Sequence, residues 1–445
     1  MFQVDVFPQK TYDRPRPGRE PEHGRVITLL RRKEMRLQTR RPDSDTKFAL
    51  SLALVTLLAP VGTDLYLASM PDIARHLDAT YASVQFTLSV YLLAQGMGQV
   101  LFGPVIDRFG RRLPLLIGIV VFTLASVWGG FSGSIFSLLA SRFIQGLAGS
   151  LLLVVGFSSV RDVTEGVRAA RLFAILLTIE GLAPIFAPIA GGYIDAYFGW
   201  RVVLWSSAAM GIAAFANSFF HLPESLDREK RLPLKPAVIY KTYARIGTDR
   251  HFLLPTLALS GVFFFLFAYI GGGAFLYQDM MGLSPDEFGL VFGITGIAVM
   301  AGAMAGSRLV RKFEVVNLAL AGIVMILAGT GIAFGSWATA GLPGMVAGFM
   351  VAMFGLGLAE PTLVSLTMGS QDKAMGFTAA LMGCLHLVLS SFSTPVSGFL
   401  LPLGAEYWFM FLLAAGGLTL GITLATKIDV RSLARMKRLS DHAAI

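Results

Sequence analysis

The chain has 445 residues, of which 54% are hydrophobic and 15% charged, and its formal net charge is +9. Soluble domains carry roughly 45–50% apolar and about 25% charged residues, so a soluble cytosolic enzyme is excluded. The single cysteine excludes a disulfide framework, and the six histidines show no metal-ligand spacing. We therefore expect a membrane protein that binds no metal and no cofactor.

Twelve apolar runs are long enough to be transmembrane helices, since one span takes about 20 residues. In chain order, the predicted spans are 48–70, 82–103, 113–131, 134–158, 171–194, 202–222, 253–278, 288–306, 316–336, 340–366, 375–401 and 405–426. This pattern predicts an all-α membrane protein.

Positive charge lies on one side of this predicted topology. Of the 37 Lys and Arg residues, all but Arg75, Arg142 and Arg201 fall in the two tails or near the connections that follow even-numbered spans. Because connections rich in Lys and Arg stay in the cytoplasm, both termini are predicted to be cytoplasmic. The net charge then reflects membrane topology, and we expect no nucleic-acid partner.

The spans divide into two blocks of nearly equal length. Residues 1–47 are basic and lack apolar periodicity, which predicts a disordered cytoplasmic tail. Helical blocks 48–222 and 253–426 flank a polar cytoplasmic linker, 223–252, and a cytoplasmic tail, 427–445, ends the chain. Two six-span halves with a site between them at the midplane are typical of secondary transporters.

Three segments carry a resemblance to a known family. The connection after span two resembles the loop motif of the major facilitator superfamily, with Gly103, Asp107, Arg108, Gly110, Arg111 and Arg112. Residues 139–146 resemble the span-four motif of the proton-coupled antiporters of that family. Residues 183–192 resemble their span-five motif, with Pro184, Pro188, Gly191 and Gly192, although the usual Gly-Pro is Ala-Pro here.

Shorter segments, 198–201, 222–225 and 277–285, resemble the Bcr/CflA-type exporters, which include chloramphenicol and bicyclomycin efflux proteins. The resemblance implies a major facilitator fold of two pseudo-symmetric six-helix bundles. It further implies multidrug efflux driven by a proton gradient, a monomer, and a place in the bacterial inner membrane.

The loop motif has two readings. Its glycines predict a tight turn, and its arginines hold the loop on the cytoplasmic side. Asp107 can pair with these arginines or cap a neighbouring helix, and the resemblance implies that such contacts latch an inner gate. The alternative is that the motif sets topology alone.

Charged groups inside spans mark functional candidates, because one costs roughly 2.5–3.5 kcal/mol at a helix centre. Asp64 and Arg142 lie at similar depths in spans that run in opposite directions, so we expect a buried ion pair. Protonation of Asp64 would then release Arg142 and couple transport to protons; the alternative is a static pair that fixes packing. Some related exporters carry a second acid where this chain has Thr56.

Glu180 shares a helix face with the small residues of the span-five motif. It is predicted to be a proton carrier or a counter-charge for cationic drugs, or else a protonated group hydrogen-bonded between helices. Pro184 and Pro188 are gating residues by resemblance, or ordinary kinks.

Other polar and aromatic side chains inside spans are candidates for a drug cavity. Glu360 precedes Pro361 and can serve the carbonyl groups that a proline frees, or border the cavity. His386 can titrate near neutral pH or make one structural hydrogen bond. The full set of cavity candidates is Tyr66, Tyr91, Gln145, Tyr269, Glu360 and His386.

The leading prediction is a proton-coupled exporter of small amphipathic drugs or metabolites that works by alternating access in the lipid bilayer. The alternative is a proton-coupled nutrient symporter on the same fold, against which the span-five motif argues. A receptor or membrane enzyme is a third class, but the sequence holds no catalytic constellation.

Overall fold

The computed structural model describes residues 42–443 except 165, 232, 372 and 373. The chain divides into two units, 1–47 and 48–445, and the predicted disordered tail lies almost wholly outside the described residues. Within the described residues every regular element is helical, and twelve stretches are long and apolar enough to cross a membrane. The all-α class and the number of spans are therefore confirmed.

The first six spans comprise α2 (Pro42–Thr56) continued by α3 (Leu58–Asp64), η1 (Leu67–Ser69) and α4 (Met70–His76), then α5 (Tyr81–Phe109), α6 (Arg112–Gly130), α7 (Ile135–Val163), α8 (Gly166–Phe198) and α9 (Trp200–His221). The last six comprise α11 (Arg250–Phe275) with η3 (Leu276–Met280), α12 (Pro285–Leu309), α13 (Val315–Trp337), α14 (Gly341–Met368), α15 (Met375–Ser391) with α16 (Ser393–Leu400) and η4 (Leu401–Leu403), and α17 (Ala405–Ala443).

Local sequence fixes several helix starts. The hydroxyl groups of Thr80 and Ser134 accept hydrogen bonds from the backbone of Ser83 and Ser137, and so cap α5 and α7. Ser284 and Glu287 form a reciprocal capping box at the start of α12. These caps place each helix end at a polar residue beside an apolar run.

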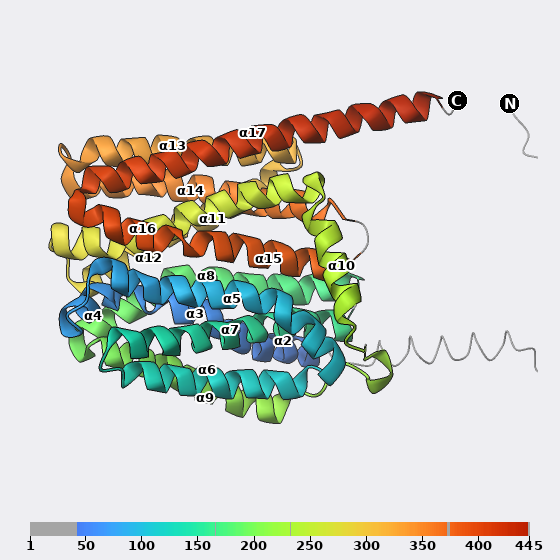
Figure 1. The fold of residues 1–445 in the computed structure, drawn as a ribbon, viewed down its shortest axis with the longest axis horizontal. Helices are drawn as coiled ribbons and strands as arrows, with labels where there is room; N and C mark the ends of the chain where they lie inside the picture. Colours follow the sequence, from blue (N-terminus) through green and yellow to red (C-terminus); the bar gives the residue numbers. More distant parts are fainter. Residues whose placement is uncertain (1–41, 165, 232, 372–373, 444–445) are drawn as a thin grey trace, which may run out of the picture. The chain divides into compact units, whose positions relative to one another are not determined.

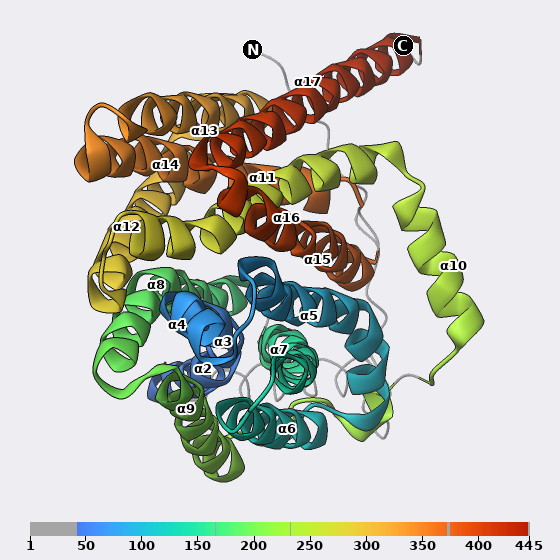
Figure 2. The ribbon, with the colours of Figure 1, turned by 60° about the vertical axis from the view of Figure 1, so that its left-hand side comes forward.

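The helices gather as two groups, α2 to α9 and α11 to α17, which lie against each other (Figures 1 and 2). Three helix pairs form most of the seam: α8 with α12, α5 with α15, and α5 with α16. At the first pair, Gly289 and Gly293 of α12 face the backbone of Pro188 and Ile185, where an added side chain would collide. Small residues therefore permit the close approach of the two groups.

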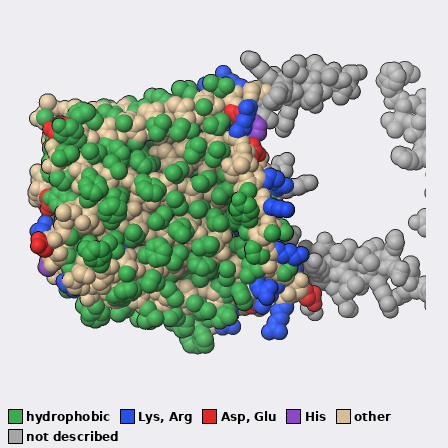
Figure 3. All heavy atoms as spheres, in the orientation of Figure 1, with side chains coloured by type: hydrophobic (Ala, Val, Ile, Leu, Met, Phe, Trp, Pro, Cys, Tyr) green, Lys and Arg blue, Asp and Glu red, His purple; other side chains and the backbone are tan. Residues whose placement is uncertain are grey.

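The two ends of the helices differ in the charged side chains that they carry. Lys and Arg side chains crowd one end of the surface in Figure 3, called the basic end here, and hydrophobic side chains cover most of the face between the ends. The opposite end carries Asp72, Arg75 and Asp279.

A short helix in the polar linker was not predicted. Helix α10 (Pro236–Gly247) lies at the basic end, between the last helix of the first group and the first helix of the second (Figure 1). Four of its partly or fully buried positions, Ile239, Thr242, Tyr243 and Ile246, follow the i, i+3, i+4, i+7 spacing of one helix face. The signal was present, but the basic residues between these positions obscured it.

Candidate functional site

A buried arginine lies in the middle of the first helix group. Arg142 on α7 is 1% exposed, and its guanidinium carbon is 4.4 Å from the ring centre of Tyr66 and 4.3 Å from that of Tyr91. A cation within about 6 Å of an aromatic centre is attracted to the face of the ring. Gly146, one turn along α7, packs on the backbone of Tyr91 and brings that ring within reach.

Hydrogen bonds to neutral groups complete this arginine site. Arg142 Nη1 donates to the carbonyl oxygen of Gly62 at 2.9 Å and also contacts the side-chain oxygen of Gln145. Helix α3 ends two residues after Gly62, so the backbone leaves this carbonyl free. Gln145 in turn donates to Ser126 Oγ at 2.7 Å. Among the described residues, Nε and Nη2 of Arg142 have no hydrogen-bond partner.

The predicted ion pair between Asp64 and Arg142 is wrong for this conformation. Asp64, 8% exposed, accepts a hydrogen bond from Thr63 at 3.2 Å, and no ion pair joins it to Arg142 in the described part of the chain. The guanidinium is drawn instead to two ring faces and to the carbonyl group that the end of α3 exposes. The similar depth of the two residues therefore placed Arg142 close to α3 correctly, but it was not sufficient to predict that Arg142 pairs with Asp64.

Glu180 on α8 lies beside Thr56 at the end of α2. Its Oε1 is buried and has no hydrogen-bond partner in the described residues. Glu180 therefore places a carboxyl group near Thr56, the position at which some related exporters carry a second acid.

The span-five motif lies at the seam between the helix groups. Gly191 meets the backbone of Leu65 and Gly192 meets that of Pro285, each too closely for a side chain. Pro184 and Pro188 are inside α8, and their carbonyl oxygens approach the glycines of α12. Any movement of one helix group relative to the other would have to change these close contacts.

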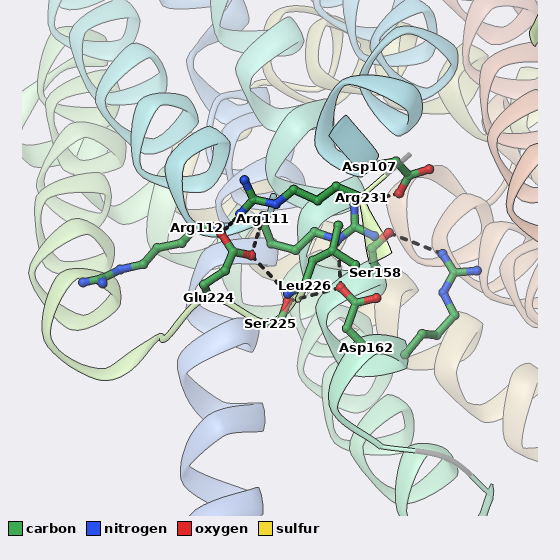
Figure 4. Close-up of polar contacts among 10 residues, drawn as sticks. Asp107, Arg111, Arg112, Ser158, Asp162, Glu224, Ser225, Leu226 and Arg231 are labelled. Atoms are coloured by element: carbon green, nitrogen blue, oxygen red, sulfur yellow. Dashed lines mark hydrogen bonds and ion pairs between the residues drawn. The ribbon is translucent and has the colours of Figure 1, made fainter. Parts of the chain in front are cut away.

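The loop motif forms a cluster of charges at the basic end (Figure 4). Arg111 donates to Asp107 and to Asp162, both at 2.8 Å, and its backbone N–H donates to Glu224 at 2.8 Å. Glu224 is also 3.6 Å from Arg231. The cluster thereby ties together the ends of α5, α7 and α9 and the start of α6.

The remaining motif residues take different positions. Arg112 donates to the carbonyl oxygen of Phe219 at 2.9 Å, and Arg108 lies over the ring of Phe109. Gly110 has φ +90°, as a tight turn requires. Gly103, however, is inside helix α5 with open space around it, so the prediction that it forms the turn is wrong. The helix continues six residues further than the predicted span.

Arg111 is strongly held in its charged form. Burial disfavours the charge, but hydrogen bonds and charge attraction from Asp162 and Asp107 outweigh this effect and raise the pKa of Arg111 above its usual range. Glu224 lies in the segment 222–225 that resembles the Bcr/CflA-type exporters, but no role is predicted from the sequence for Glu224 or for Arg231. Their position shortly after the sixth span was the available signal.

A cavity of about 240 Å³ opens near this cluster. It is lined from both helix groups and from the linker by Gln99, Asp107, Arg111, Asp162, Tyr243 and Phe377, among others. The Tyr243 hydroxyl donates to Val100 at 3.3 Å, and burial, with Cys384 and Asp107 nearby, raises its pKa to about 12. None of the six predicted cavity residues lines this cavity.

Those six residues are distributed elsewhere. Tyr66, Tyr91 and Gln145 belong to the Arg142 site. Tyr269 is fully buried against Phe292 and Phe349.

Glu360 and His386 also lie apart from the cavity. Next to Pro361, it is Thr362 that donates to the carbonyl oxygen of Ala359, at 2.6 Å, rather than Glu360. His386 Nδ1 lies 2.9 Å from the carbonyl oxygen of Met382, and its ring packs on Phe263.

The end opposite the basic end is closed by contacts between the two groups. Arg75 pairs with Asp279 at 3.0 Å, Gln278 donates to the carbonyl oxygen of Ala68 at 2.8 Å, and the Tyr81 and Phe275 rings stack. The molecule therefore holds a cavity at the basic end and a seal at the other.

Known proteins resemble this chain over most of its length. A model of the Major Facilitator Superfamily matches residues 52–395. An uncharacterized MFS-type transporter, YdgK of Bacillus subtilis, is 32% identical over 80% of this chain and 90% of its own. A bicyclomycin resistance protein homolog of Haemophilus influenzae is 31% identical over 60% and 67%.

The multidrug resistance protein MdtM of Salmonella typhimurium is 27% identical over 86% of this chain and 93% of its own. Among solved structures, the bacterial homolog of the human lysosomal transporter Spinster has a TM-score of 0.67 at 13% identity, over 87% of this chain and 96% of its own. That likeness concerns the fold alone.

Proposed function

Because the chain belongs to the Major Facilitator Superfamily, and is thus a membrane transporter rather than an enzyme, we propose that it exports small amphipathic molecules in exchange for protons. The observation that carries this proposal is the buried cation Arg142, which has no carboxylate partner among the described residues and lies beside a helix that ends in Asp64. The printed names of two relatives, a bicyclomycin resistance homolog and a multidrug resistance protein, support drugs as substrates.

The proposed orientation has the basic end in the cytoplasm. Lys and Arg are retained on the cytoplasmic side of membranes, and the described basic side chains gather at that end. The cavity beside Asp107 and Tyr243 then opens toward the cytoplasm, from which an exporter takes its substrate.

Asp64 and Arg142 are the proposed coupling pair, acting through a common helix. Arg142 is bonded to α3 at Gly62, and Asp64 is the last residue of α3. Loss or gain of a proton by Asp64 changes the local charge by one, and such a change acts strongly where water is excluded. An ionised Asp64 would draw Arg142 from the Gly62 carbonyl and move α3 relative to α7.

Glu180 is the proposed second proton acceptor, since its buried Oε1 has no hydrogen-bond partner in the part of the chain that the structure describes. The loop cluster around Arg111 is proposed to hold the first helix group rigid while the groups rock. A proton that enters down a membrane potential of 100 mV supplies about 2.3 kcal/mol per charge for the cycle.

The test uses everted vesicles and a panel of toxic amphipathic compounds in a bacterium that lacks its own efflux pumps. Expression should raise resistance to some compounds, and those compounds should accumulate in everted vesicles only while an acid interior is maintained. Accumulation on the opposite gradient would indicate a symporter. No gradient-dependent flux for any compound would refute proton coupling. Vesicles that carry Arg142→Gln at equal protein abundance provide the matched background.

A further inference from the structure

Two buried oxygen atoms without partners lie between η1 and α8, toward the end opposite the basic end. Asp195 is 6% exposed and Ser69 is fully buried, and neither Asp195 Oδ1 nor Ser69 Oγ has a hydrogen-bond partner among the described residues. Helix α8 packs against η1, which brings the Asp195 carboxyl group next to the Ser69 hydroxyl group. Leaving a buried polar group unsatisfied costs about 1–3 kcal/mol, so such a pair calls for a functional reason.

The position of Asp195 connects the sealed end with Asp64. Gly191, one turn before Asp195, packs on the backbone of Leu65, and Ser69 follows Leu65 by one turn of the chain. Asp64 directly precedes Leu65. Ser69 follows Asp64 by five residues in the direction of α4 and the sealed end, so Asp195 beside Ser69 stands between Asp64 and the sealed end.

Charged groups surround this position from several elements. Helix α4 brings Asp72, Arg75 and His76 near Asp195; Asp72 is 3.5 Å from Arg75 and 3.2 Å from His76. Arg75 also reaches Asp279 of η3 at 3.0 Å. The other charged residues of the elements packed against this part of α8 are Asp64 of α3, Asp286 and Glu287 of α12 and Arg201 of α9.

The surrounding ion pairs leave Asp195 out. The carboxylate of Asp72 is shared by Arg75 and His76 of its own helix, and Arg75 also reaches the other helix group, so no ion pair reaches Asp195 in the described residues. Separation of the two groups at this end would break the Arg75–Asp279 contact and open Asp195 to water.

We propose that Asp195 is a proton-relay residue, which takes up a proton from water at the end opposite the basic end and passes it, with the Ser69 hydroxyl, toward Asp64. This rests on the proposed function, in which protons drive transport. The proton binds to a carboxylate oxygen of Asp195, leaves it as Asp64 takes up a proton, and restores the Asp195 carboxylate. No other reactant is consumed.

The experiment separates relay from structure with two transport modes of the full chain in liposomes. The probe is a compound to which the protein confers resistance in the panel above. Asp195→Asn should lower pH-driven transport about 100-fold, the lower end of what a positioned proton-transfer group contributes. Exchange of labelled for unlabelled compound at equal pH should stay within about twofold of the wild-type rate, since one turnover of exchange needs no net proton.

Two further variants complete the design. Asp195→Glu should restore pH-driven transport, because it retains the carboxylate. Asp78→Asn is the matched control: Asp78 is an exposed acid near the same end with φ +46°, a conformation that Asn also tolerates, and its variant should behave as wild type.

A direct readout of the carboxyl group does not need a substrate. Infrared difference spectra of the purified full chain, recorded after an acid step, should show a protonated carboxyl band that Asp195→Asn removes and Asp78→Asn leaves. Wild-type pH-driven transport by Asp195→Asn, or equal loss of both transport modes, would overturn the relay. Failure of the wild-type protein in pH-driven transport would instead refute the proposed function.

Discussion

Arg111 and Arg142 are both nearly inaccessible to solvent, at 6% and 1% exposed, but the groups around them differ. Arg111 has carboxylates on two sides, Asp107 and Asp162, each at 2.8 Å. Arg142 has two aromatic faces, one backbone carbonyl group and one side-chain amide. Carboxylates neutralise the charge of Arg111, whereas the groups that contact Arg142 in the described residues are all neutral.

This difference separates a fixed cation from a responsive one. Charge-assisted hydrogen bonds to carboxylates are strong and hold Arg111 in one geometry. Among the described residues, two nitrogen atoms of Arg142 have no hydrogen-bond partner, so Arg142 can donate to a carboxylate that becomes available. The comparison predicts that changes at Arg142 alter transport, whereas changes at Arg111 alter stability.

The largest effect is expected at Arg142. Arg142→Gln removes the buried guanidinium charge and should reduce gradient-driven flux to the level of vesicles without transporter. Arg142→Lys keeps the charge but loses the planar group that stacks on Tyr66 and Tyr91, and should be intermediate. Uptake into everted vesicles at matched abundance provides the measurement. Equal activity of the two variants would show that charge has no part in the cycle.

Asp64→Asn should separate coupling from folding. Since Asp64 does not pair with Arg142 here, the change strands no charge, and Asn can still accept the hydrogen bond from Thr63. We expect a change in stability below about 1 kcal/mol, the scale of one ordinary hydrogen bond. Compound exchange should persist while accumulation against a gradient is lost.

Thermal unfolding in detergent and the two transport modes test this together. A large loss of stability in Asp64→Asn would mean that Asp64 does pair with Arg142 in the dominant state in solution.

Arg111→Met should act mainly on stability. It strands Asp107 and Asp162 without a cation, and we expect a loss of about 2 kcal/mol, less than the 3–5 kcal/mol for fully buried pairs because both acids are partly exposed. Because these acids raise the pKa of Arg111, this contribution is fully present below the unfolded-state pKa of arginine as long as the two acids stay ionised, and it is lost as the pH rises through the raised pKa.

Membrane abundance and thermal stability provide the measurement for Arg111→Met. Arg108→Gln is the control, since Arg108 makes only a ring contact with Phe109 among the contacts described here. Normal stability of Arg111→Met would remove the contrast between the two arginines.

The smallest effect is expected at the linker helix. Tyr243→Phe removes one hydrogen bond to Val100 but keeps the ring packed on Phe377, and should cost about 1 kcal/mol. Thermal stability should fall slightly while resistance is retained. Loss of transport at normal stability would indicate that the Tyr243 hydroxyl takes part in transport through the cavity that it lines.

The sequence by itself determined the fold class, the twelve spans and the loop motif at the basic end. These depend on long apolar runs and on the positions of Lys and Arg, which are local properties of the chain. It also singled out Arg142, Asp64 and Glu180, because charge inside an apolar run is unusual wherever the run folds.

Only the tertiary structure decided which groups these charges meet. The stacking of Tyr66 and Tyr91 on Arg142 depends on how closely α7 approaches α3 and α5, and the glycines that permit this approach carry no sign of their partners. The free carbonyl group of Gly62 exists because α3 ends at Asp64, within a span that reads as one continuous apolar run. Asp195 and Ser69 meet across 126 positions of sequence, and such a contact is set by helix packing, which sequence periodicity does not encode.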